Sequence, residues 1–189
     1  MKIWDSLMGR RQPIMANLDS LFALPTASIT LQTAAGFNPT GMGSVCYRSA
    51  EGAAFAQTQT DVVALLDADE GPDVEHSTDQ YGFTWLLARH DAADVAGLVT
   101  DLHAVNTTLE GQGFGPGLLC SLVGFTDAAG RRLGLVYLYK QGTFYPFVPL
   151  EGQHRDNLAE ISIRDLIRGD LPVEPQMSRW MPVWGAPGL

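Results

Sequence analysis

Three strand-like segments follow one another in the second half of the chain with only short gaps between them. They cover residues 118–126, 132–140 and 143–148, and they are rich in aliphatic and aromatic residues. Asp127-Ala128-Ala129-Gly130 and Gln141-Gly142 lie between them and supply the residues of two tight turns. Consecutive hairpins make antiparallel pairs, whereas a doubly wound parallel sheet needs a long crossover between neighbouring strands. The segment therefore predicts an antiparallel sheet.

Helices are predicted on either side of these strands. The clearest helix covers Asp91–Leu109, where apolar residues recur at helical spacing and Gly111 and Gly113 follow. A second covers residues 57–66, although 62–66 alone also fits a strand. Asp156 is predicted to cap a last helix that runs to Arg168. Its inward-facing residues are expected to be Leu158, Ile161 and either Ile163 or Leu166.

The first half is predicted to mix short helices and strands. Asn17 is expected to cap a helix over Leu18–Leu24 that Pro25 ends, and residues 26–32 are expected to form a strand. A loop over 36–43 and strands over 44–49 and 81–89 complete the order. The sum is a single α+β domain over residues 1–189, with a mainly antiparallel sheet flanked by helices.

Both ends of the chain are apolar and aromatic. Residues 1–11 have the pattern of an amphipathic helix. This helix is expected either to pack on its own domain or to enter a partner's groove or the membrane interface. Residues 172–189 are predicted to be an extended aromatic tail that folds back over the core or serves as a recognition peptide. The candidate partner-binding residues are Ile3, Trp4, Leu7, Trp180 and Trp184.

Charge and composition limit the function classes. Asp and Glu outnumber Lys and Arg by 21 to 12, a net charge of -9, which disfavours nucleic acid and broad adsorption to anionic lipid. No membrane-spanning run and no secretory signal are visible, so we expect a cytoplasmic protein. In that compartment Cys46 and Cys120, far apart in sequence, are expected to be buried free thiols rather than a disulfide or a metal pair.

The motifs that resemble reactive sites fail in context. The glycines over 111–117 follow a helix and precede a strand, the reverse of a dinucleotide-binding loop. The acidic run that begins at Asp67 has Thr78 where a calcium loop needs glutamate. The four histidines have no spacing typical of zinc ligands, and Ser44 lacks the spacing of a nucleophile elbow. We predict no catalytic, cofactor or metal site; a noncontiguous site near His76, His90 or the acidic loop is the enzyme alternative.

Several segments, spread nearly from end to end, resemble one family. They are Gly9-Arg10-Arg11-x-Pro13, Asn17-Leu18-Asp19-x-Leu21-Phe22-Ala23-Leu24-Pro25, Gly36-Phe37-x-Pro39-Thr40-Gly41, Tyr81-Gly82-Phe83-Thr84-Trp85 and Trp180-x-Pro182-Val183-Trp184-x-Ala186-Pro187-Gly188-Leu189. This pattern is similar to the actinobacterial PspA-associated proteins of the PspAB family. The element order is also similar to YbjN and the type III secretion chaperones, although the helix near Gln57 and the strand near Thr143 depart from that order.

The resemblance implies a cytoplasmic, non-enzymatic accessory of the PspA phage-shock, or envelope-stress, system. It carries over no catalytic residues. The implied partner is PspA or a similar protein; a homodimer and peripheral membrane contact through the N-terminus stay open. The second hypothesis is a chaperone-like module for other clients, and the third is the enzyme with a noncontiguous site.

Overall fold

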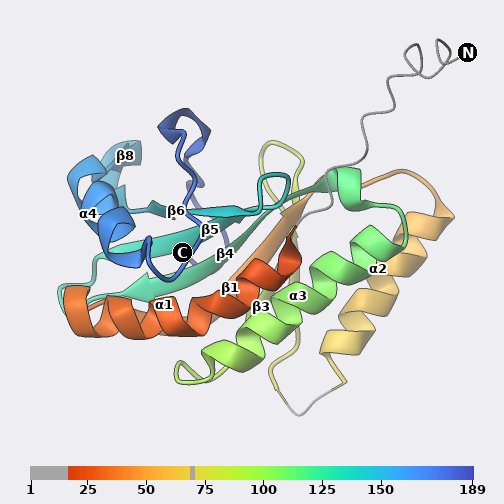
Figure 1. Ribbon diagram of the computed structural model, residues 1–189. Helices are drawn as coiled ribbons and strands as arrows, with labels where there is room; N and C mark the ends of the chain where they lie inside the picture. Colours follow the sequence, from red (N-terminus) through yellow and green to blue (C-terminus); the bar gives the residue numbers. More distant parts are fainter. Residues whose placement is uncertain (1–16, 69–70) are drawn as a thin grey trace, which may run out of the picture.

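The computed structural model describes residues 17–68 and 71–189, and its centre is a six-stranded sheet (Figure 1). The strand order is β2-β3-β1-β4-β5-β6, and every neighbouring pair in it is antiparallel. A second, two-stranded sheet joins β7 to β8. The predicted α+β class with a mainly antiparallel sheet is confirmed. The strands are β1 (Asn38–Tyr47), β2 (Glu75–Thr78), β3 (Thr84–Arg89), β4 (Leu118–Thr126), β5 (Arg132–Leu138), β6 (Thr143–Phe147), β7 (Pro149–Leu150) and β8 (His154–Arg155).

Helices cover one face of the large sheet. α1 and α3 lie across this face, and α2 packs beside α3 (Figure 1). Their apolar sides and the sheet residues beneath them form the helix-side core, which includes Val45, Tyr47, Leu98, Leu102, Val123 and Leu135. The helices are η1 (Leu18–Ala23), α1 (Leu24–Thr30), η2 (Leu31–Ala35), α2 (Ala53–Leu66), α3 (Val95–Gly111), η3 (Gly115–Gly117), η4 (Glu151–Gln153), α4 (Asn157–Ile167) and η5 (Met177–Arg179).

The C-terminal tail covers the opposite face. Side chains of β1, β3, β4, β5 and β6 that point away from the helices pack there against residues 180–189. This tail-side core consists of Cys46, Trp85, Cys120, Leu122, Val136, Tyr145, Phe147, Trp180 and Ala186. The central strands of the sheet are therefore buried on both faces, whereas the edge strand β2 is exposed. Of the two arrangements open for the tail, the structure shows the one that folds back.

The strand predicted over residues 26–32 is wrong, because this segment is helical. Pro25 does not end the helix: it stands in the first turn of α1, where a proline needs no amide donor. Leu24, Ala27, Ser28 and Leu31 are buried at helical spacing, so burial of one side outweighs the strand preference of the β-branched residues.

The predicted loop over 36–43 is also wrong from Asn38 onward, where β1 begins. Its pairing with β4 shifts register between Pro39 and Gly43. Gly41 supplies the left-handed conformation of this irregularity, with φ of 75°. The bulge accounts for the loop-like composition of this segment, which nevertheless pairs with β4 at Asn38 and Pro39 and with β3 from Met42 onward.

Most of the remaining elements agree with the predicted ones in type, whereas β2, β7 and β8 have no predicted counterpart. β4, β5, β6, α2, α3 and α4 all form, and residues 62–66 belong to α2 rather than to a strand. Asp156 caps α4 as expected, accepting a hydrogen bond from the Ala159 amide at 2.9 Å. Leu158 does not face inward, since it is 77% exposed. Ile163, one of the two predicted alternatives, is buried together with Glu160 and Ile167, and Ile161 is half-buried.

Candidate functional site

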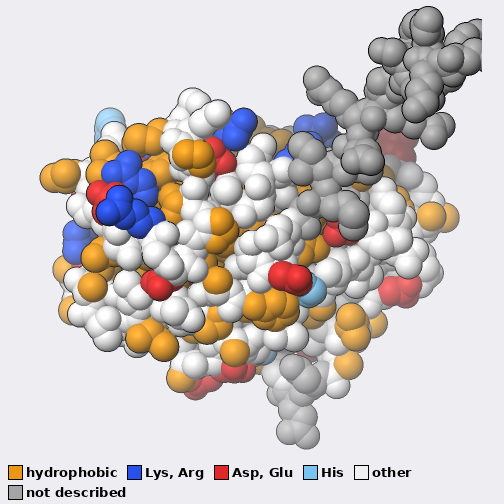
Figure 2. Space-filling model, viewed as in Figure 1, with side chains coloured by type: hydrophobic (Ala, Val, Ile, Leu, Met, Phe, Trp, Pro, Cys, Tyr) orange, Lys and Arg blue, Asp and Glu red, His pale blue; other side chains and the backbone are white. Residues whose placement is uncertain are grey.

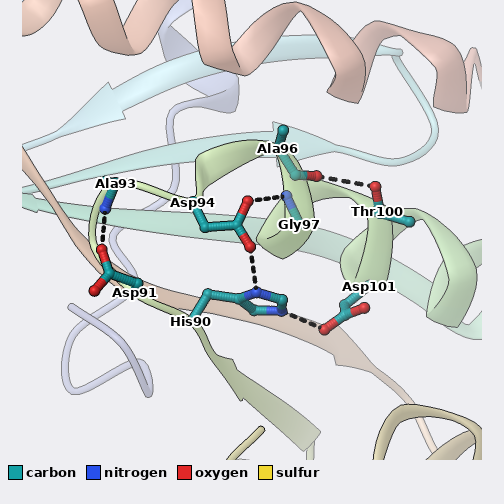
Figure 3. Close-up of polar contacts among 8 residues, drawn as sticks. All are labelled: His90, Asp91, Ala93, Asp94, Ala96, Gly97, Thr100 and Asp101. Atoms are coloured by element: carbon teal, nitrogen blue, oxygen red, sulfur yellow. Dashed lines mark hydrogen bonds and ion pairs between the residues drawn. The ribbon is translucent and has the colours of Figure 1, made fainter. Parts of the chain in front are cut away.

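His90 lies between two carboxylates at the start of α3 (Figure 3). Its Nε2 is 2.6 Å from Oδ2 of Asp101, and its Nδ1 is 3.0 Å from Oδ2 of Asp94. β3 ends one residue before His90, whose amide donates to the Gly41 carbonyl at 2.8 Å. Asp94 is the N-cap of α3, and its other oxygen accepts from the Gly97 amide. Asp101 follows seven residues later, two helical turns along the same side.

This geometry favours the charged form of His90. Burial lowers the pKa of His90, but the hydrogen bonds to Asp101 and Asp94 outweigh burial, so the pKa lies above its usual value. The pKa of Asp94 is lowered, first by the hydrogen bond from the Gly97 amide and then by His90. Both ring nitrogens donate to carboxylates in this state. In this charged form neither ring nitrogen has a free lone pair for proton abstraction or for a metal.

A small pocket of about 140 Å³ lies beside this cluster. Typical ligand pockets measure about 300–1,000 Å³, so this one admits only a small group. His76, on exposed β2, is not among the residues that line it. The lining residues are Leu66, Gly71, Pro72, Val74, Ala88, Arg89, His90, Asp91 and Asp101.

The described residues hold no metal-like cluster. Within 17–68 and 71–189, no group of three or more His, Cys, Asp or Glu side chains could hold an ion. Asp67, which begins the acidic loop, accepts a hydrogen bond from the Val74 amide at 2.7 Å and so closes that loop. Over the same part of the chain, no helix has the length and apolar character to cross a bilayer.

A buried polar network attaches the tail to the sheet. Residues 172–174 run beside β6, where the Phe144 amide donates to the Pro172 carbonyl and the Glu174 amide donates to the Phe144 carbonyl, each at 2.8 Å. The Glu174 carboxylate is buried and accepts from Thr143 Oγ1 at 2.7 Å. Burial raises the pKa of Glu174, but hydrogen bonds from Thr143 and the Gln176 amide outweigh it, and the pKa is lowered.

A second part of the network joins α4 to the tail. Glu160 is 1% exposed and accepts from Arg155 Nε and the Val148 amide, both at 2.9 Å. Arg155 also donates to the Trp180 carbonyl at 2.7 Å. This ion pair therefore fixes the point at which the tail turns onto the sheet.

The structure separates the five predicted partner-binding residues. Ile3, Trp4 and Leu7 lie outside the described residues. Trp180 is 4% exposed, stacks on Tyr145 and donates from Nε1 to the Glu174 carbonyl. Trp184 is half-buried and meets Phe147 edge-on, with ring centroids 4.9 Å apart. In this arrangement the two tryptophans contact their own chain, and Trp180 offers almost no surface to a partner.

Sequence reasoning missed the apolar side chains that are exposed. Phe22 and Ile29, on the continuous run of η1 and α1, are 49% and 63% exposed. Figure 2 shows hydrophobic side chains scattered among polar ones over the face that carries α1 and α3. A signal was present: once residues 18–35 are read as one helical run, Phe22 and Ile29 fall opposite the buried positions. Others exposed elsewhere are Leu65, Tyr81, Leu150, Leu158, Leu166, Met177 and Met181.

Comparison with known proteins gives one match. Neither the curated proteins nor the solved structures include a significant match to this chain. The similarity to YbjN and the secretion chaperones therefore stays a prediction. The family model of PspA associated protein B matches residues 1–188, nearly the whole length. The chain thus belongs to the PspAB family, as its terminal and central motifs predict.

Proposed function

We propose that this protein is a non-enzymatic accessory that binds PspA in the envelope-stress response. The observation that carries the proposal is the family match over residues 1–188, whose description names PspA as the associated protein. Both ring nitrogens of His90 already contact carboxylates, and the pocket beside the ring is small, which supports a binding role over catalysis. The cytoplasmic location expected from the sequence is part of the same proposal.

The proposed contact surface joins the N-terminal segment to the helix that follows it. The sequence places Ile3, Trp4 and Leu7 among the apolar residues at helical spacing within 1–11, and η1 begins at Leu18. Ile29 is more than half exposed on this helical run. Apolar side chains of this kind on one contiguous stretch fit the groove or helix face of a partner protein.

The test is binding of purified PspA to the full chain, measured by calorimetry and by pull-down. Removal of residues 1–11 and the substitution Ile29→Ser are each expected to weaken binding about tenfold or more, as loss of a buried anchor does. Tyr81→Ser is the matched control, because Tyr81 is 71% exposed and lies between β2 and β3. It is expected to bind PspA as the unchanged protein does.

Two results would contradict the proposal. Absence of any PspA binding by the unchanged chain would reject PspA as the partner and favour the module for other clients. Equal binding by all the variants would reject this contact surface while leaving the partner in place. Removal of the tail is not a clean test, because residues 180–189 are part of the tail-side core.

A further inference from the structure

The two cysteines of the chain are direct neighbours in the folded protein. Cys46 of β1 and Cys120 of β4 stand opposite each other in the antiparallel register. Both belong to the tail-side core, so their side chains point to the same face of the sheet. Cys46 is 3% exposed and Cys120 is 8% exposed. They are the only cysteines in the sequence, and the fold brings them together across 74 residues of chain, 120 minus 46.

The backbone already meets the requirement for a bond between them. Opposite residues of an antiparallel pair have Cα atoms about 4.5 or 5.5 Å apart, depending on the hydrogen-bonding position. Disulfides span Cα separations of about 4.4–6.8 Å. Both side chains lie in the same buried cluster, and the neighbouring Cys120 thiol, followed by burial, raises the pKa of Cys46. A disulfide therefore requires only a small adjustment of the two side chains and no movement of either strand.

We propose that Cys46 and Cys120 form a reversible dithiol–disulfide site that small peroxides oxidise when the C-terminal tail lifts. Cys120, the more exposed thiol, attacks hydrogen peroxide as its thiolate: an S–O bond forms, the O–O bond breaks, and hydroxide leaves. Cys46 then attacks the sulfenic sulfur, an S–S bond forms, the S–O bond breaks, and water leaves. In sum, two thiols and one hydrogen peroxide give one disulfide and two waters, and an external thiol reverses the reaction.

The tail controls access to this site. Trp180 and Ala186 belong to the same buried cluster as the two thiols, and Val183, Trp184 and Leu189 pack against it. The tip of the tail lies directly over β4: a Cβ atom on Gly124 would collide with the Gly188 carbonyl. With the tail in place, both thiols are buried, and burial helps to raise the pKa of Cys46, which makes that thiol slow to react.

The experiment exposes the reduced full chain to hydrogen peroxide, unfolds it in N-ethylmaleimide and measures the intact mass. The expected product is 2 Da lighter, takes up no maleimide and yields a peptide that links Cys46 to Cys120. Dithiothreitol is expected to restore two maleimide-reactive thiols. Cys46→Ser and Cys120→Ser lack the partner thiol and are expected to give no internal disulfide.

Control of access is tested with Gly124→Ala, which is expected to speed disulfide formation at least several-fold. Gly111→Ala is the matched control, because a Cβ there meets nothing within 4 Å, and its rate is expected to equal that of the unchanged chain. If Gly124→Ala does not fold, Trp184→Ala loosens the tail instead. If the folded chain still has two maleimide-reactive thiols after hydrogen peroxide treatment, or gains oxygen on a single cysteine, the proposed site is wrong. Equal rates in the tail variants and the control would overturn the role of the tail.

Discussion

The cluster of His90, Asp94 and Asp101 shows what individual residues in the sequence reveal and conceal. His90 was singled out only as part of an enzyme alternative. Asp94 lies near the start of the predicted helix, where negative charge is favourable. Their contact depends on Asp94 being the N-cap and on Asp101 standing two turns later on the same side. That spacing is visible in the sequence once the exact helix start is known, and helix ends are the least predictable part of a helix.

Replacing His90 by Gln is expected to destabilise the protein by about 1–2 kcal/mol, since hydrogen bonds to charged groups are lost. Because the pKa of His90 is higher in the folded protein than in the unfolded one, His90 stabilises the fold fully below its unfolded-state pKa of about 6.5. This stabilisation disappears as the pH rises through the folded-state pKa. The difference in unfolding free energy between His90→Gln and the unchanged chain is therefore expected to be larger at pH 5.5 than at pH 8.5.

Urea denaturation at both pH values measures this difference. His76→Gln is the control, since His76 lies on exposed β2. A penalty for His90→Gln that is the same at both pH values, or that grows with pH, would show that the charged histidine is not what stabilises the cluster.

The type of most elements could be predicted, and the failures have a common cause. α3, α4 and the strands β4, β5 and β6 have strong periodicity, caps or turns of their own. Residues 26–32 include the β-branched Thr26, Ile29 and Thr30, which favour a strand locally. Only the packing of Ala27 and Leu31 in the core decides for a helix. Tertiary packing of this kind has no local signal.

The attachment of α4 depends on one buried carboxylate. Glu160→Gln removes a charge that pairs with Arg155 and leaves that guanidinium, whose side chain is 20% exposed, without its counter-ion. Breaking a buried pair from one side costs about 3–5 kcal/mol, and partial exposure places this pair at the lower end, about 3 kcal/mol. Glu151→Gln, at an exposed position, is expected to change stability by less than about 0.5 kcal/mol.

Thermal unfolding followed by circular dichroism measures both variants. A second readout separates the tail from the helix: Arg155 holds the Trp180 carbonyl, so tryptophan fluorescence of Glu160→Gln is expected to shift to longer wavelength as Trp180 meets water. An unchanged melting temperature with unchanged emission would show that the Glu160–Arg155 pair contributes nothing to holding the tail.

The whole molecule is a sheet with helices on one face and the tail on the other, and the sequence held an indirect sign of this. Strands that face water on one side alternate apolar and polar residues, whereas those buried on both sides do not. β4 and β5 are apolar almost without interruption, and nearly every residue in them is buried. A cover for the second face was therefore required. Folding of the tail back over the core was one of the two predicted arrangements, but the extended tail has no periodic pattern that decides between this arrangement and a recognition peptide.

The tail is thus expected first of all to stabilise the fold, and a substitution of Trp180 measures this contribution. Trp180→Ala removes a side chain that is 4% exposed, stacks on Tyr145 and donates to the Glu174 carbonyl, so it is expected to cost about 3–5 kcal/mol. Met181→Ala, next in the chain and 60% exposed, keeps the carbonyl that accepts from Tyr145 and is expected to cost less than about 0.5 kcal/mol. Chemical denaturation measures the loss of unfolding free energy in both variants. Capture of PspA, measured at a temperature where both variants are folded, then shows whether the tail also contributes to binding. A stable Trp180→Ala protein that no longer captures PspA would show that the tail leaves the sheet to meet its partner.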